Sequence, residues 1–180
     1  MATYKFIRAL TLLAALLASA CASVGGTGLN NNPAASFQVK VWLERPAPLK
    51  VGDLVQVRAR TDRACFLYIY YIAGSGAIRQ IFPDNLQSGN RIDPGIIYQI
   101  PPPGASYQFR LKPPPAQEKI VAIATLTPVR FFENEEMDYA GVIPLVKLDE
   151  TAWQQKLNAK LDTLPAATWS ADTVYFTYSP

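Results

Sequence analysis

The chain has 180 residues, of which 49% are hydrophobic and 17% charged, and its formal net charge is +3. This length and composition indicate one globular domain with at most a small appendage, and they exclude a chain that is disordered throughout. Histidine is absent, which excludes Ser-His-Asp and Cys-His catalysis and any histidine-based zinc site.

Residues 1–20 have the pattern of a secretory signal peptide. Lys5 and Arg8 are their only charges, and an apolar run follows from Ala9 to Ala18. That run is about half of the roughly 20 residues that a membrane-spanning helix needs, and small residues follow it. A buried N-terminal helix is the alternative. Without this leader the chain keeps 15 basic and 14 acidic residues, a net charge of about +1, so its charge does not support nucleic-acid binding.

The leader ends in Leu17-Ala18-Ser19-Ala20-Cys21, which resembles the lipobox of bacterial lipoproteins, although Ala18 stands where leucine is usual. The resemblance implies that Cys21 is acylated, with palmitate among its acyl chains, and becomes the new N-terminus. Ala22, in place of the aspartate linked to inner-membrane retention, implies anchoring at the outer membrane. We expect the protein to lie on the periplasmic face of that membrane. The alternative is ordinary cleavage, after which Cys21 is a free thiol in an oxidising compartment and could pair with Cys65.

Residues 21–36 are predicted to form the lipidated cysteine and a flexible tether, because small and polar residues dominate there. An ordered edge strand is the alternative. The folded body is then 37–180. Within it, apolar and polar residues alternate over 37–43, 55–60 and 107–111, whereas 65–72 and 120–124 are apolar on both faces. Turn residues occupy 45–53 and 73–77, and a longer loop spans 83–95. These patterns predict antiparallel strands packed as a β-sandwich, with the two doubly apolar runs at its centre.

The tail of the chain is predicted to add one helix and a final strand. Asp149 is a suitable N-cap, and the helix 150–164 places Trp153, Leu157, Leu161 and Leu164 on one face before Pro165 ends it. Alternation over 172–180 indicates a last strand that rejoins a sheet. We expect the helix to pack across an edge or an end of the sandwich.

About 80 residues of the body carry a pattern of short motifs. They are Gly52-Asp53, Phe66-Leu67-Tyr68, Gly74-Ser75-Gly76, Ile81-Phe82-Pro83-Asp84, Gly89-Asn90-Arg91-Ile92, Ile100-Pro101 and Ala122-Ile123-Ala124-Thr125. This pattern resembles a bacterial family of unknown function, DUF4384, whose members occur as lipoproteins and as modules fused to peptidases or kinases. Asp84 and the Asp93-Pro94-Gly95 turn depart from the usual pattern. The resemblance implies an immunoglobulin-like β-sandwich and supplies no catalytic residues.

Several loop residues are candidates for a carboxylate pair in acid–base catalysis: Asp84, Asp93, Glu133, Glu135, Glu136 and Asp138. Residues of this kind in loops usually face water. We therefore expect that the protein is not an enzyme and needs no cofactor.

A calcium site is a second hypothesis for the loop at 83–95. Asp84, Asn85, Asn90 and Asp93 offer hard oxygen ligands within ten positions, but their spacing matches no EF-hand. The alternative is that these side chains cap their own turns.

The loop 131–141 is a candidate contact site for a partner protein. Glu133, Glu135, Glu136, Asp138 and Tyr139 would form it, as a charged rim around aromatic anchors. The alternative is that the aromatic residues fold back onto the core while the acidic residues keep the loop in water.

Aromatic and proline-rich segments allow two further interpretations. Tyr68, Tyr70 and Tyr71 could form an exposed strip for glycans or could fill the core, and the prolines at 101–105 and 112–117 favour stiffened turns over docking motifs.

The sequence as a whole favours a non-enzymatic, lipid-anchored protein that binds a protein partner in the cell envelope. A peptidoglycan-binding module is the alternative.

Overall fold

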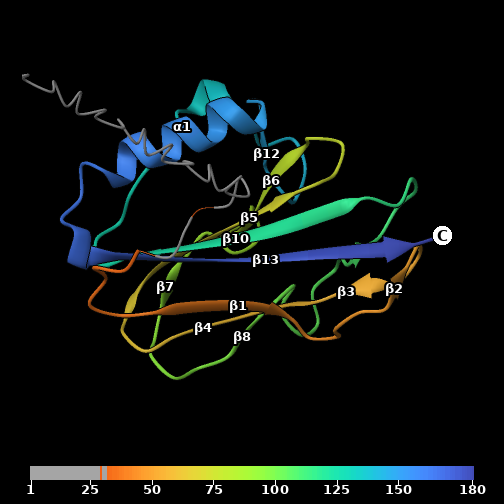
Figure 1. Cartoon of the computed structure of the whole chain (residues 1–180), viewed down its shortest axis with the longest axis horizontal. Helices are drawn as coiled ribbons and strands as arrows, with labels where there is room; N and C mark the ends of the chain where they lie inside the picture. The colour runs from red at the N-terminus through yellow and green to blue at the C-terminus, as the bar shows by residue number, and fades with distance from the viewer. Residues whose placement is uncertain (1–28, 30–31) are drawn as a thin grey trace, which may run out of the picture.

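The computed structural model describes residue 29 and residues 32–180; the predicted leader and Cys21 lie outside these residues. Figure 1 shows three layers, with a helix above a large central sheet and a small sheet below it. The described residues contain no helix that is long and apolar enough to cross a membrane.

The large sheet has the strand order β11-β12-β6-β5-β10-β13-β2, and β7 pairs with β5 outside that path. Its strands are β2 (Leu49–Lys50), β5 (Cys65–Ile72), β6 (Ile78–Phe82), β7 (Arg91–Ile92), β10 (Gln117–Thr125), β11 (Met137–Asp138), β12 (Leu145–Val146) and β13 (Trp169–Ser179). All of their pairings are antiparallel except that between β13 and β2, which is parallel.

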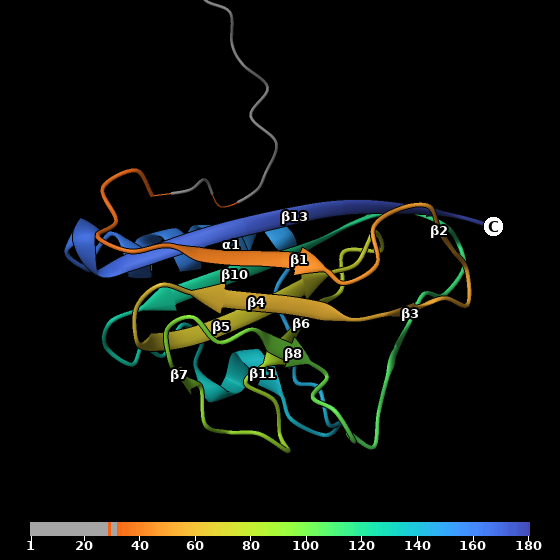
Figure 2. The ribbon, with the colours of Figure 1, turned by 90° about the horizontal axis from the view of Figure 1, so that it is seen from below.

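The small sheet lies across the large one in the order β1 (Val39–Leu43), β4 (Val57–Thr61) and β8 (Tyr98–Ile100). Figure 2 shows it from its outer side, in front of β5 and β10. A separate pair joins β3 (Leu54–Val55) to β9 (Phe109–Arg110). The prediction of a mainly antiparallel β-sandwich with one helix and a final strand is confirmed.

Side chains on the central strands alternate between two hydrophobic cores. On β5, Leu67 and Ile69 face the small sheet, whereas Tyr68 and Tyr70 face the helix layer. Residues of β10 alternate in the same way, and the side chains from Ile120 to Ala124 are all at most 1% exposed. The two runs predicted to be apolar on both faces are therefore central strands with a cover on each side.

The helix α1 (Glu150–Leu161) begins where the sequence predicts, because the Asp149 carboxylate accepts a hydrogen bond from the amide of Ala152 at 2.8 Å. It ends three residues earlier than predicted. The expectation that it packs across an edge or an end of the sandwich is wrong. Trp153, Leu157 and Leu161 are buried against the face of the large sheet that points away from the small sheet, because the apolar side chains there need a cover.

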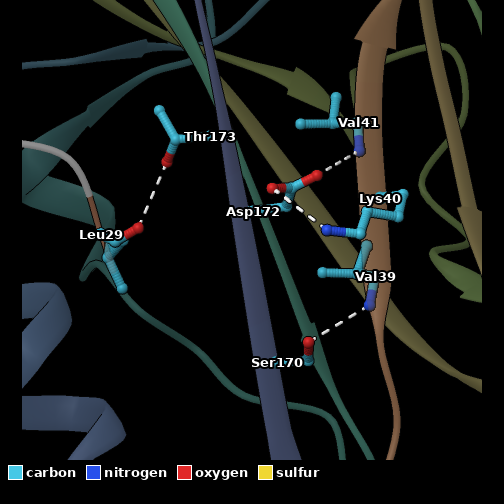
Figure 3. Close-up of polar contacts among 7 residues, drawn as sticks. All are labelled: Leu29, Val39, Lys40, Val41, Ser170, Asp172 and Thr173. Carbon is cyan, nitrogen blue, oxygen red and sulfur yellow. Dashed lines mark hydrogen bonds and ion pairs between the residues drawn. The ribbon is translucent and has the colours of Figure 1, made fainter. Parts of the chain in front are cut away.

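Two 3₁₀ turns, η1 (Asn134–Glu136) and η2 (Ala166–Thr168), complete the elements. Residues assigned by sequence to the tether contact the second of these. The side-chain amide of Asn32 donates to the carbonyls of Ala166 and Trp169 at 2.6 and 2.9 Å. Leu29 is 6% exposed, and its carbonyl accepts a hydrogen bond from the Thr173 hydroxyl at 3.4 Å (Figure 3). These two residues therefore pack against the body.

The free edge of β1 is joined to β13 by side chains rather than by main-chain pairing (Figure 3). The amide of Val39 donates to the Ser170 hydroxyl at 3.2 Å, and that of Val41 donates to the Asp172 carboxylate at 2.9 Å. The other carboxylate oxygen of Asp172 lies 3.9 Å from the Lys40 ammonium. Ser170 and Asp172 thus hold the small sheet against the large one along this edge.

We predict that Asp172→Ala lowers the free energy of unfolding by about 1–3 kcal/mol, because it leaves the buried Val41 amide without its acceptor. Urea unfolding followed by circular dichroism measures this. The control is Thr177→Ala, an exposed position on the same strand. Equal stabilities of the two variants would contradict the role of Asp172.

Candidate functional site

Asp84 is a structural centre for the loops that follow β6. It is 6% exposed, and one carboxylate oxygen accepts hydrogen bonds from the amides of Leu86 and Gln87 at 2.8 and 2.7 Å. The other oxygen accepts a hydrogen bond from the hydroxyl of Tyr107. Burial, and then the neighbouring carboxylate, raise the pKa of Tyr107, so its hydroxyl stays a donor.

Asn85 joins this loop to the segment that follows β11. Its side-chain amide donates to the carbonyls of Tyr139 and Gly141 at 2.9 and 2.7 Å, and its main-chain amide donates to the carbonyl of Val142 at 3.0 Å. Asn85 therefore connects two loops that the sequence presents as separate candidate sites.

The other two calcium candidates have different surroundings. The side-chain amide of Asn90 donates to the carbonyl of Leu67 at 3.2 Å, whereas Asp93 is exposed. Within the described part of the chain, no group of three or more cysteine and acidic side chains could hold a metal ion. The Asx residues of this loop mostly cap turns and hold backbone.

The loop 131–141 turns most of its apolar side chains inward. Phe131, Phe132 and Met137 are at most 5% exposed, and the Phe131 ring packs edge-on against Tyr68 with centroids 5.0 Å apart. Tyr139 is the exception, with half of its surface exposed. The aromatic anchors expected at a partner contact are thus reduced to one.

The acidic residues of this loop stabilise its own turn. Glu133 and Glu136 form a reciprocal capping box around η1, and Glu136 pairs with Lys156 of α1. The hydrogen bond from Lys156 is the main cause of the lowered pKa of Glu136, which keeps that carboxylate charged. Glu135 and Asp138 are exposed.

The central tyrosines do not form the exposed strip considered from the sequence, so that interpretation is wrong. Tyr68 and Tyr70 are 7% and 0% exposed, and Tyr71 is half-buried on the opposite face of β5. Cys65 is 2% exposed, and burial raises the pKa of its thiol, which confirms the prediction that it packs as a small hydrophobic residue.

Exposed aliphatic residues that the sequence did not predict lie on the loop after β6 and directly before β8. Leu86, Ile96 and Ile97 are 63%, 50% and 52% exposed. A hollow of about 270 Å³ adjoins Ile97 and Gln87, and Arg58 and Gln99 lie at the same hollow. Two adjacent isoleucines directly after the Pro94-Gly95 turn were the available signal. The name β8 patch is used below for Leu86, Ile96 and Ile97.

A larger hollow, of about 370 Å³, lies beside β3 and β9. Pro101, Pro102 and Pro103 line it, together with Tyr107 and Phe109. The first proline-rich segment therefore shapes the surface as a stiff turn, as the sequence indicated.

Residues 48–128 match the sequence family described as a domain of unknown function, DUF4384. Comparison with curated proteins found no match, and comparison with solved structures found none. The matched segment runs from just before β2 to just beyond β10, so it contains Asp84, Asn85 and the β8 patch. It excludes β1, α1 and β13, which complete the layers of this body.

We predict that Ca²⁺ at about 5 mM, above the roughly millimolar dissociation constants of weak extracellular sites, leaves the thermal midpoint unchanged. The physical reason is that both carboxylate oxygens of Asp84 already accept protein hydrogen bonds. Differential scanning fluorimetry measures the midpoint, with Mg²⁺ at equal ionic strength as the control. A calcium-specific rise that Asp84→Asn removes would restore the calcium hypothesis.

Proposed function

We propose that the protein is a lipid-anchored, non-enzymatic component of the bacterial outer membrane whose folded body binds another envelope protein. The observation that carries the binding role is the β8 patch. Ile97 lines a hollow together with Arg58, Gln87 and Gln99. Leu86 and Ile96, the chain neighbours of Gln87 and Ile97, are also at least half exposed. An apolar centre with a polar rim is the usual composition of a protein interface.

The loop 131–141 borders the same surface. Asn85 precedes Leu86 of the β8 patch and holds the carbonyl of Tyr139, whose side chain is exposed. Tyr139, with Glu135 and Asp138, would extend the contact on this side. A partner of matching shape would insert apolar side chains beside Ile97 and meet polar groups around them.

The short chain between Cys21 and the folded body supports the proposed location at the membrane. Seven residues lie between Cys21 and Leu29, so the eight Cα-to-Cα steps that join them span at most about 29 Å. Leu29 packs among the helix-layer core residues, which include Leu157 and Ala171. An acylated Cys21 would therefore keep the folded body close to the membrane surface.

The surroundings of the acidic residues support a non-enzymatic role. Asp84 is occupied by two amides and a phenol, and Glu136 by Lys156 and a turn amide. The remaining acidic candidates, Asp93, Glu133, Glu135 and Asp138, are exposed to water.

We predict that the protein incorporates radiolabelled palmitate in its bacterial host and that Cys21→Ser abolishes the label and releases the protein from membranes. Cys65→Ala is the matched control, because Cys65 is buried in the core and should leave labelling intact. An unlabelled wild-type protein, or label that persists in Cys21→Ser, would contradict the anchor.

We predict that a photo-crosslinking residue placed at Ile97 gives one discrete protein adduct in intact cells, whereas the same residue at Tyr175 does not. Tyr175 is similarly exposed, at 44%, but lies on β13. Leu86→Asp should reduce the Ile97 adduct several-fold, because a charge in an apolar contact is unfavourable. Identical adduct patterns at both positions, or no adduct at Ile97, would argue against the β8 patch as the partner site.

A further inference from the structure

A third hollow lies on the opposite side of the large sheet from the small sheet, between β5, β6 and the segment that leads to β11. Its volume is about 200 Å³. Side chains from distant parts of the chain line it, among them Tyr68, Tyr70, Gln80, Arg130, Asn134 and Tyr139. It is called the Tyr70 hollow below.

Tyr70 is the unusual member of this group. Its side chain is fully buried, yet its hydroxyl has no hydrogen-bond partner among the described residues. A buried hydroxyl without a partner is unfavourable, and native proteins rarely leave one so. The neighbouring Tyr68 shows the contrast, because its hydroxyl accepts a hydrogen bond from the amide of Val129 at 2.8 Å.

The Tyr70 ring is held in place by its neighbours. It packs edge-on against Phe132 and Trp153, with ring centroids 5.7 and 5.6 Å apart. Burial raises the pKa of Tyr70, with smaller contributions from Tyr68 and Tyr139, so the hydroxyl remains a donor at neutral pH. The hollow thus has a fixed donor without a protein acceptor.

The other lining groups indicate what would supply the acceptor. Gln80 and Asn134 carry amides, which pair with hydroxyl and carbonyl groups, and Tyr139 adds an exposed aromatic ring. Arg130 is exposed and is the one charged side chain that lines the hollow within the described residues. The volume is below that of sites for drug-sized ligands, so one ring-sized unit would fill it.

We propose that the Tyr70 hollow binds a single acidic monosaccharide unit, with the Tyr70 hydroxyl donating to a sugar oxygen and Arg130 pairing with the sugar carboxylate. The exposed ring of Tyr139 would contact the apolar face of the sugar, and the amides of Gln80 and Asn134 would bind its polar substituents. A sugar is favoured over a peptide because the lining combines aromatic rings and amides with one cation. The choice of an envelope sugar as probe rests on the proposed location; the site itself does not.

The test is calorimetric titration of the full-length protein in detergent with N-acetylmuramic acid and with N-acetylglucosamine, which lacks the carboxylate. We expect the acidic sugar to bind at least tenfold more tightly. Arg130→Gln should make the two affinities equal. Tyr70→Phe should weaken binding of the acidic sugar at least tenfold without lowering the thermal midpoint, because it removes an unpaired hydroxyl.

Tyr71→Phe is the matched control, because Tyr71 is the next residue of β5 and faces the other core; it should bind like the wild type. No binding of the acidic sugar by the wild-type protein, or unchanged binding by Tyr70→Phe, would overturn the proposal. Preference for an acidic dipeptide such as D-Ala-D-Glu over the sugar would overturn it too. The crosslink from Ile97 is measured separately, so loss of the sugar site and loss of the partner site are distinguishable.

Discussion

Burial of β5 and β10 on both faces is the constraint on which the remaining structure depends. Leu67 and Tyr70 lie on opposite faces of β5, and both are 0% exposed. Burial of a large aliphatic side chain stabilises a fold by roughly 1.5–3 kcal/mol, so neither face can be left in water. One sheet cannot cover both faces. The small sheet covers the first, and α1 with the segment 131–137 covers the second.

This constraint explains the contrast between the elements inside and outside the family match. The matched residues 48–128 supply the central strands β5 and β10 but lack β1, α1 and β13. β13 pairs with β10, β1 completes the small sheet, and α1 covers the helix-layer core. Asp172 and Ser170 of β13 then bind the free amides of β1 (Figure 3). Here the matched segment therefore folds as part of a larger body.

Patterns local to the sequence predicted the elements well and their long-range partners poorly. Alternation and two-sided apolar runs identified β1, β4, β5 and β10, and Asp149 located the start of α1. The face covered by α1 was not predictable from its own residues, because the sequence shows which helical face is apolar but not which surface receives it.

The candidate site shows the same limit more sharply. The close spacing of oxygen-bearing side chains made Asp84 and Asn85 look like calcium ligands. Their hydrogen-bond partners Tyr107 and Tyr139, however, lie 23 and 54 residues away. No short-range signal indicates such pairing. Leu29 and Asn32 were likewise assigned to a tether from composition, while the groups that hold them lie more than 130 residues further on. The exposure of the apolar residues of the β8 patch likewise depends on the path of a loop in the folded protein.

Asn85 also relates the two proposed binding surfaces. Asn85 holds the carbonyl of Tyr139, which lines the Tyr70 hollow, and the next residue, Leu86, belongs to the β8 patch. A substitution at Asn85 would therefore disturb both surfaces through the backbone, so it could not show which surface a lost interaction belongs to. Tyr70 and Ile97 each line a different hollow and are fixed by different neighbours. Because of this arrangement, changes at these two positions can assign a lost interaction to one surface or the other.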